Sequence, residues 1–235
     1  MVLMERKLRY EGNRFFKLYH LCYYFSKSND FSAERKLILD FKKGDENALR
    51  HFSILALKSL EGNHIDDDVF IIRALHSNEL KVTDRNSSPL DRLGDSLATV
   101  FDCTYYPKIL TKTNATQPVK SLSLIERKIE LDNVYQIDTG LFDLNERKII
   151  IIDDIVTTGT TASYIIDCIL KEFPRAKINV FSLAWTPTLK QQLYIQKREK
   201  RGFILNEPEI QYGRKSSEWV DTDFENGETN VSYYP

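Results

Sequence analysis

Four consecutive isoleucines, followed by two aspartates and a threonine-rich turn, constrain this chain more than any other segment. The segment reads K-I-I-I-I-D-D-I-V-T-T-G-T-T-A-S, at residues 148–163. An unbroken apolar stretch bounded by turn residues is typical of a central strand of a parallel sheet, because such a strand is buried on both faces. Open α/β sheets bind ligands beyond the carboxyl ends of their strands. We therefore expect Asp153 and Asp154 at the mouth of a cleft.

The turn after the aspartates has the chemistry of an anion-binding site. Its residues offer hydroxyls or an unhindered backbone directly before an amphipathic helical pattern: Thr157, Thr158, Gly159, Thr160 and Thr161. A helix N-terminus carries unpaired N–H donors and about half a positive charge, so it suits a phosphate monoester without a lysine. The two aspartates accept hydrogen bonds only, so they can hold vicinal sugar hydroxyls or orient a hydrated magnesium ion. Together these groups predict a site for ribose 5-phosphate.

Residues 151–161 resemble the phosphoribosyl diphosphate (PRPP) binding motif of the type I phosphoribosyltransferases, which is an apolar stretch followed by D-D-x-x-T-T-G-x-T. The resemblance implies that Asp153 and Asp154 are the catalytic carboxylates, bind the ribose hydroxyls and meet Mg2+ through water. It implies that residues 157–161 wrap the 5-phosphate. A Walker loop and a G-x-G-x-x-G fingerprint are both missing from the sequence. The remaining alternative is a buried strand with a polar turn that binds no ligand. Two adjacent aspartates disfavour this alternative, because they are costly in a packed loop unless another group neutralises their charges.

The resemblance also implies the fold class. We expect an α/β protein with the type I phosphoribosyltransferase fold, a twisted, mainly parallel sheet flanked by helices, with a small hood from the terminal segments. The length of 235 residues, with 42% hydrophobic and 29% charged residues, suits one compact enzyme-sized unit. The net charge of -1 argues against a strongly basic nucleic-acid surface.

The compartment expected from the sequence is the cytoplasm. The three cysteines are odd in number and far apart, which favours reduced thiols over disulfides or a zinc site. Residues 1–10 are charged, unlike a signal peptide, and the longest aromatic stretch, 15–25, is too short to span a bilayer. We expect no membrane partner.

A second site element is predicted upstream. Residues 69–72 form another apolar stretch that favours a buried strand, and R-A-L-H-S-N follows it. In phosphoribosyltransferases the loop after the first core strand holds the pyrophosphate, so the resemblance assigns this role to Arg73 and the backbone at Ala74. A guanidinium suits a diphosphate well. In the alternative interpretation, Arg73 pairs with a neighbouring carboxylate and His76 is a surface residue.

The polar stretch 111–123 predicts a mobile loop rather than part of the core. The family uses a flexible loop at about this place to cover the diphosphate and exclude water. The resemblance therefore makes Lys112, Lys120 and Arg127 candidates to contact the leaving group. Taken singly, each lysine is better explained as a solvated surface charge, and Arg127 is better placed than either lysine.

Several other segments resemble the ComF-type, competence-associated branch of these proteins. They are 36–62, with an amphipathic helical pattern, 121–127 (S-L-S-L-I-E-R) and 182–185 (S-L-A-W). Unlike that branch, this chain lacks an N-terminal four-cysteine zinc ribbon, and its stretch 72–76 lacks both prolines of P-x-P-L-H.

We divide the chain into an N-terminal helical segment (1–35), a phosphoribosyltransferase-like core (36–186) and a C-terminal extension (187–235). Either terminal segment could supply the hood. The extension has many apolar anchors, so we expect it to pack on the core rather than to be disordered.

The function implied is displacement of magnesium pyrophosphate from PRPP by a nitrogen nucleophile, a glycosyltransferase reaction with Mg2+ as cofactor. The base or amine acceptor is not identifiable from the sequence. Two alternatives are a non-catalytic regulator or adaptor that binds PRPP or a nucleotide, and a DNA-handling adaptor, which the near-neutral charge makes least favoured. Homodimers are common among enzymes of this size, and the oligomeric state stays open.

Overall fold

A computed structural model gives the architecture of the chain. It describes residues 3–10, 14–25, 32–63, 65, 67–83, 88–115, 134–140, 142–189, 191–193 and 195. The strands are β1 (Met4–Tyr10), β2 (Arg14–Tyr23), β3 (Val69–Arg73), β4 (Thr104–Tyr105), β5 (Leu110–Lys112), β6 (Tyr135–Ile137), β7 (Lys148–Val156) and β8 (Lys177–Trp185). The helices are α1 (Ser32–Lys42), α2 (Glu46–Leu60), α3 (Pro89–Phe101), the short 3-10 helix η1 (Pro107–Ile109) and α5 (Thr160–Glu172).

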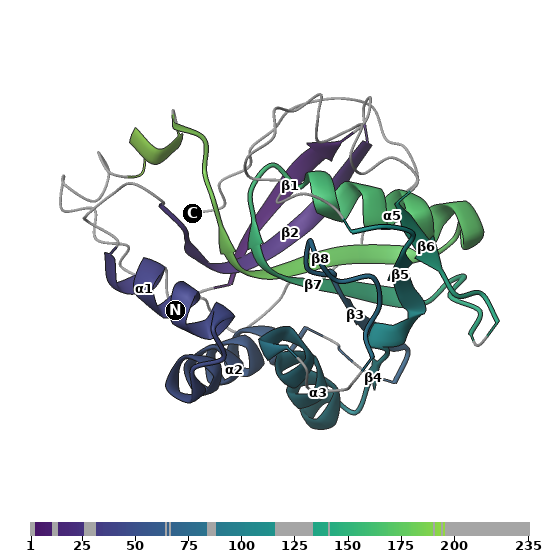
Figure 1. Cartoon of the computed structure of the whole chain (residues 1–235), viewed down its shortest axis with the longest axis horizontal. Helices are drawn as coiled ribbons and strands as arrows, with labels where there is room; N and C mark the ends of the chain where they lie inside the picture. The colour runs from purple at the N-terminus through teal and green to yellow at the C-terminus, as the bar shows by residue number, and fades with distance from the viewer. Residues whose placement is uncertain are drawn as a thin grey trace.

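A six-stranded sheet with the order β1-β2-β8-β7-β3-β4 forms the centre of the molecule (Figure 1). Every neighbouring pair is parallel except β1 and β2, which form an antiparallel hairpin. Strands β5 and β6 make a separate antiparallel pair. These pairings confirm the predicted fold class, an α/β protein with a mainly parallel sheet flanked by helices.

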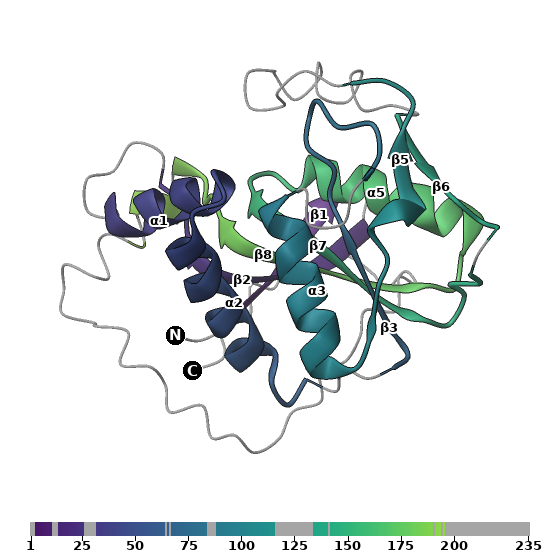
Figure 2. The ribbon, with the colours of Figure 1, turned by 60° about the horizontal axis from the view of Figure 1, so that its bottom comes forward.

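The isoleucine-rich strand β7 lies inside the sheet, between β3 and β8. Ile149 and Ile151 pack in the layer that contains the apolar face of α5, whereas Ile150 and Ile152 pack in the opposite layer with residues of α1, α2 and α3. Figures 1 and 2 show α5 on one face of the sheet and α1 to α3 on the other. The strand is therefore buried on both faces, as the sequence predicts.

Helix α2 begins where its sequence provides a cap. The side chain of Asp45 accepts a hydrogen bond from the backbone N–H of Ala48, which satisfies one donor of the first turn. Leu49, Phe52 and Leu60 lie on its buried face. This confirms the amphipathic helix expected within residues 36–62.

The prediction of a helical N-terminal segment over residues 1–35 is wrong for most of that range. Residues 4–10 and 14–23 are strands, and β2 continues the sheet in parallel with β8. Phe16, Leu18 and His20 alternate as buried positions, which is the period of a strand. That period is hard to see in the sequence, because Leu21 and Cys22 are both buried and because one of the buried positions, His20, is polar. Among the residues of this range that the structure describes, a helix begins at Ser32.

The C-terminal extension predicted over residues 187–235 lies outside the described residues from 196 onward, so its packing stays a prediction. The same holds for residues 116–133, which include Lys120 and Arg127. None of the described helices combines the length and apolarity that crossing a lipid bilayer requires.

Candidate functional site

The two aspartates stand near the carboxyl end of β7, where the sequence places them, but they point to different sides of the sheet. Asp154 forms an ion pair with Lys42, the last residue of α1, at 2.6 Å between its Oδ2 and the lysine Nζ. Asp153 is half-buried, and its Oδ1 accepts a 2.8 Å hydrogen bond from the backbone N–H of Asp154. Lys42 therefore compensates the charge of the more buried carboxylate.

The turn from β7 into α5 depends on a glycine. Gly159 is the N-cap residue of α5 and has a left-handed backbone, with φ 78°. A Cβ added there would lie 2.8 Å from Cζ of Phe16 and 3.2 Å from Cδ1 of Leu8, so this turn packs closely against the β1–β2 hairpin. Glycine is required here because other residues disfavour the left-handed backbone and because a side chain would have no room beside Phe16 and Leu8.

The same turn presents donors of the kind an anion needs. No side-chain hydrogen bond caps the first turn of α5, in contrast to the capped starts of α2 and α3. The hydroxyls of Thr158 and Thr160 lie 2.8 Å apart in a hydrogen bond, and Thr158 is exposed. These hydroxyls therefore lie at the helix N-terminus, the positive end of the helix dipole, and the binding of a phosphate there stays a prediction.

The predicted contact of the Arg73 guanidinium with a diphosphate is not supported by the structure. Its side chain is 1% exposed, and all five N–H donors are used by the carboxylates of Asp91 and Glu79 and by the carbonyl oxygen of Ala74. Burial alone lowers the pKa of Arg73, but the two carboxylates outweigh burial and raise the pKa above its ordinary value. The ion-paired alternative is the correct one.

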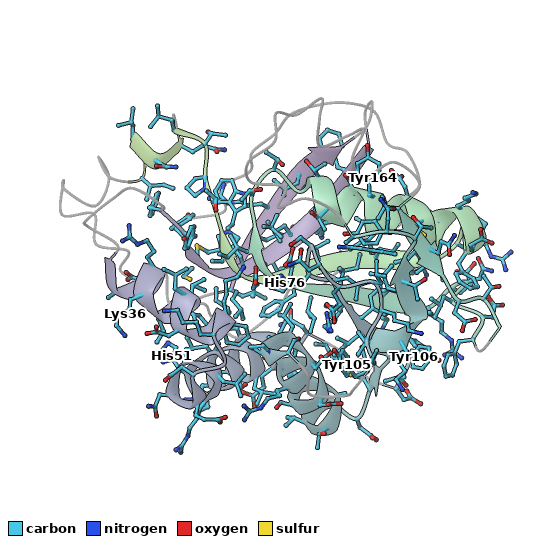
Figure 3. All side chains as sticks on the ribbon, in the orientation of Figure 1. Lys36, His51, His76, Tyr105, Tyr106 and Tyr164 are labelled. Carbon is cyan, nitrogen blue, oxygen red and sulfur yellow. The ribbon has the colours of Figure 1, made fainter. Side chains whose placement is uncertain are left out.

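The backbone at Ala74 is also engaged, since its N–H donates a 2.9 Å hydrogen bond to the carbonyl oxygen of Ile152. This bond extends the pairing of β3 with β7 by one residue. His76 is exposed, as in the alternative interpretation, and is labelled in Figure 3 on the loop that follows β3. Its backbone N–H donates to Glu79, the same carboxylate that binds Arg73.

Lys112 is neither part of a mobile loop nor a solvated surface charge. It ends β5 and is 6% exposed, and its Nζ donates to the carbonyl oxygens of His76 (2.7 Å) and Leu75 (3.4 Å). Burial lowers the pKa of Lys112 to about 8, although the charges of Glu79 and Asp153 act in the opposite direction. The structure thus brings Lys112, the loop after β3 and Asp153 together.

Sequence reasoning missed Lys42 entirely and missed the buried state of Lys112. A basic residue in the last turn of a helix is common, because it interacts favourably with the C-terminal carbonyls, so Lys42 gives no distinctive signal. Among the described residues, no three His, Cys, Asp or Glu side chains are grouped closely enough to hold a metal ion.

No family model and no curated protein sequence matches the chain. Solved structures that superpose on it include adenine phosphoribosyltransferase from Trypanosoma brucei in complex with AMP, pyrophosphate and ribose-5-phosphate (10% identity, 72% of this chain and 83% of that chain, TM-score 0.38). A hypoxanthine-guanine phosphoribosyltransferase from Bacillus anthracis (14%, 66% and 72%, TM-score 0.35) and an adenine phosphoribosyltransferase from Saccharomyces cerevisiae (14%, 67% and 74%, TM-score 0.34) are also similar. Structural similarity at these scores does not indicate a function. The function is therefore inferred from the residues of the site.

Proposed function

We propose that this chain is a phosphoribosyltransferase that binds PRPP and transfers its ribose 5-phosphate to a nitrogen nucleophile with release of pyrophosphate. One observation carries the proposal. The carboxylates of Asp153 and Asp154 and the left-handed Gly159 turn follow one another at the carboxyl end of an inner parallel strand and lead directly into the N-terminus of α5. That order matches a ligand with a diol at one end and a phosphate monoester at the other.

Each group in the site has a distinct task in this proposal. The N-terminus of α5 and the hydroxyls of Thr158 and Thr160 bind the 5-phosphate and fix the sugar. Asp153 accepts hydrogen bonds from the ribose hydroxyls, and its negative charge stabilises the oxocarbenium character that develops at C1. Asp154, paired with Lys42, holds the strand end in place.

The leaving diphosphate lies, in this proposal, toward the loop after β3. Arg73 does not contact it, since its donors are all used within the protein. The ammonium of Lys112 draws the carbonyl oxygens of Leu75 and His76 inward, which fixes the backbone of that loop around the diphosphate. Lys112 acts through the loop, as a positioning residue.

The carboxylates also fit a magnesium ion that arrives with the substrate. Mg2+ is typically bound by one or two carboxylates, substrate phosphates and several waters rather than by an all-protein cage. Asp153, through water, is the residue that would hold it, and the ion would neutralise charge on the leaving pyrophosphate. The protein itself positions the sugar and excludes water.

The test is a coupled assay of pyrophosphate release from PRPP and Mg2+ with adenine, guanine, hypoxanthine, uracil and orotate. We expect turnover with one of these acceptors and its loss in Asp153→Asn. The matched control is Asp143→Asn, which removes an exposed carboxylate on the loop before β7. Thermal stabilisation by PRPP without turnover across the acceptors would instead support a PRPP-binding regulator.

We further propose a relationship to the ComF-type branch and a cytoplasmic location. The relationship is supported by the similarity of residues 36–62, 121–127 and 182–185, of which the first now includes the capped helix α2. The location is supported by the cysteine usage.

A further inference from the structure

A partly buried arginine on β1 is held by uncharged groups. The Nε of Arg6 donates to Nε2 of His20 (3.2 Å), and its Nη2 donates to the hydroxyl of Tyr23 (3.0 Å). Its guanidinium carbon lies 3.9 Å from the ring centroid of Trp185, which is cation–π distance. Three strands therefore converge on this side chain, because β1 carries the arginine, β2 the histidine and tyrosine, and β8 the tryptophan.

His20 fixes the arginine but does not neutralise it. Because Nε2 of His20 accepts from Arg6, Nδ1 carries the proton and donates to the carbonyl oxygen of Cys22 at 3.1 Å. The side chain is fully buried, and burial followed by the charge of Arg6 lowers the pKa of His20 to about 3. In the part of the chain that the structure describes, no carboxylate pairs with Arg6. A partly desolvated guanidinium without a counter-charge is stabilised by an oxyanion.

A further donor beside this arginine has no hydrogen-bond partner. The Nε1 atom of Trp185, over whose ring the guanidinium lies, is buried and finds no acceptor within the described ranges. The Oγ1 atom of Thr186, the next residue along the chain, is likewise buried without an acceptor there. Trp185 itself is 3% exposed. Buried polar groups in folded proteins almost always have partners, so an unsatisfied indole N–H next to a cation favours a ligand rich in acceptor oxygens.

The arginine lies next to the turn that precedes α5. Leu8, two residues along the same face of β1, packs against Gly159. At the carboxyl ends of β7 and β8, Trp185 pairs in register with Val156. The backbone N–H of Thr186 donates a 2.9 Å hydrogen bond to the carbonyl oxygen of Val156. Residue 157, the first of the turn, follows directly. In Figure 1 the segment between β7 and α5 passes beside β1 and β2.

We propose that Arg6, oriented by His20, Tyr23 and Trp185, is a second oxyanion contact of the 157–161 turn and recognises a phosphate monoester. This turn contains no basic residue, so the hairpin β1–β2 supplies the cation that the turn lacks. The identification of the phosphate as the 5-phosphate of ribose rests on the proposed function. The edge hairpin β1–β2 thereby becomes part of the binding site.

The test is calorimetric titration of ribose 5-phosphate into the full-length wild type, Arg6→Met and Arg6→Lys. Methionine keeps an unbranched apolar stem over Trp185 and removes the charge. We expect Arg6→Met to weaken binding by about tenfold or more, the loss expected for a charge-assisted hydrogen bond, and Arg6→Lys to retain part of the affinity. Near-UV circular dichroism of the free variants establishes that the aromatic cluster is intact.

The matched control is Lys7→Met, because Lys7 is an exposed cation next to Arg6 on the same strand. We expect the Lys7→Met variant to bind ribose 5-phosphate with the affinity of the wild type. Equal affinity of the wild type and a folded Arg6→Met would overturn the inference while leaving the proposed function intact. Failure of the wild type itself to bind ribose 5-phosphate would contradict the proposed function, and the inference with it. A loss of affinity as large in Lys7→Met would show a general charge effect and would also overturn the inference.

Discussion

Replacement of Gly159 by alanine tests the geometry of the turn before α5. Two costs add at this position. A non-glycine residue in the left-handed region costs ~1–2 kcal/mol. In addition, the new Cβ would lie 2.8 Å from Cζ of Phe16, whose side chain is only 1% exposed and is held in the core. Overpacking of this kind costs a further ~1–3 kcal/mol. We therefore expect Gly159→Ala to reduce the free energy of unfolding by ~2–5 kcal/mol.

Gly44 provides a control that separates the two costs. Its φ is 81°, almost the same as at Gly159, but a Cβ added there would meet nothing within 4 Å. Gly44→Ala should therefore lose only the conformational part, ~1–2 kcal/mol. Urea denaturation of both variants, with equal m-values, measures the difference directly. Equal destabilisation of the two variants would refute the close packing of this turn against the hairpin.

Three further substitutions test the charged groups. Arg73→Met leaves the buried Asp91 and the half-buried Glu79 without their cationic partner and should destabilise the fold by ~3–5 kcal/mol in urea denaturation; a loss below ~1 kcal/mol would contradict these ion pairs. Lys42→Met leaves Asp154 unpaired and should cost ~1–3 kcal/mol, whereas no change would show that this ion pair is not formed. The pKa of Lys112 is lowered to about 8 from 10.5, so between these pH values the unfolded chain binds more protons and stability rises with pH. The stability of the wild type relative to Lys112→Met should therefore increase between pH 8 and 10.5, and a flat difference would contradict the burial of this ammonium group.

Features carried by local pattern were predicted from the sequence. The four isoleucines of β7 have no competing interpretation as a surface segment, so both the strand and the location of Asp153 and Asp154 follow from them. The glycine in the turn and the helical period of α5 place the start of that helix equally well. These predictions succeed because strand burial and helix capping depend on neighbouring residues.

Features that depend on tertiary contacts were predicted less well. The sequence leaves Arg73 open between a diphosphate contact and an ion pair, because its partner Asp91 is eighteen positions away on another element. The ion pair of Lys42 with Asp154 likewise joins a helix end and a strand end that only the folded topology brings together. The hairpin β1–β2 was mistaken for a helix because its buried face includes the polar His20.

The central claim is that residues 153–161 bind PRPP, and calorimetric titration of PRPP with Mg2+ tests it most directly. We predict measurable binding to the wild type and to the Asp143→Asn control, and loss of binding in Asp153→Asn, since the ribose hydroxyls lose their charged acceptor. Equal affinity in the wild type and Asp153→Asn would contradict the assignment of this site.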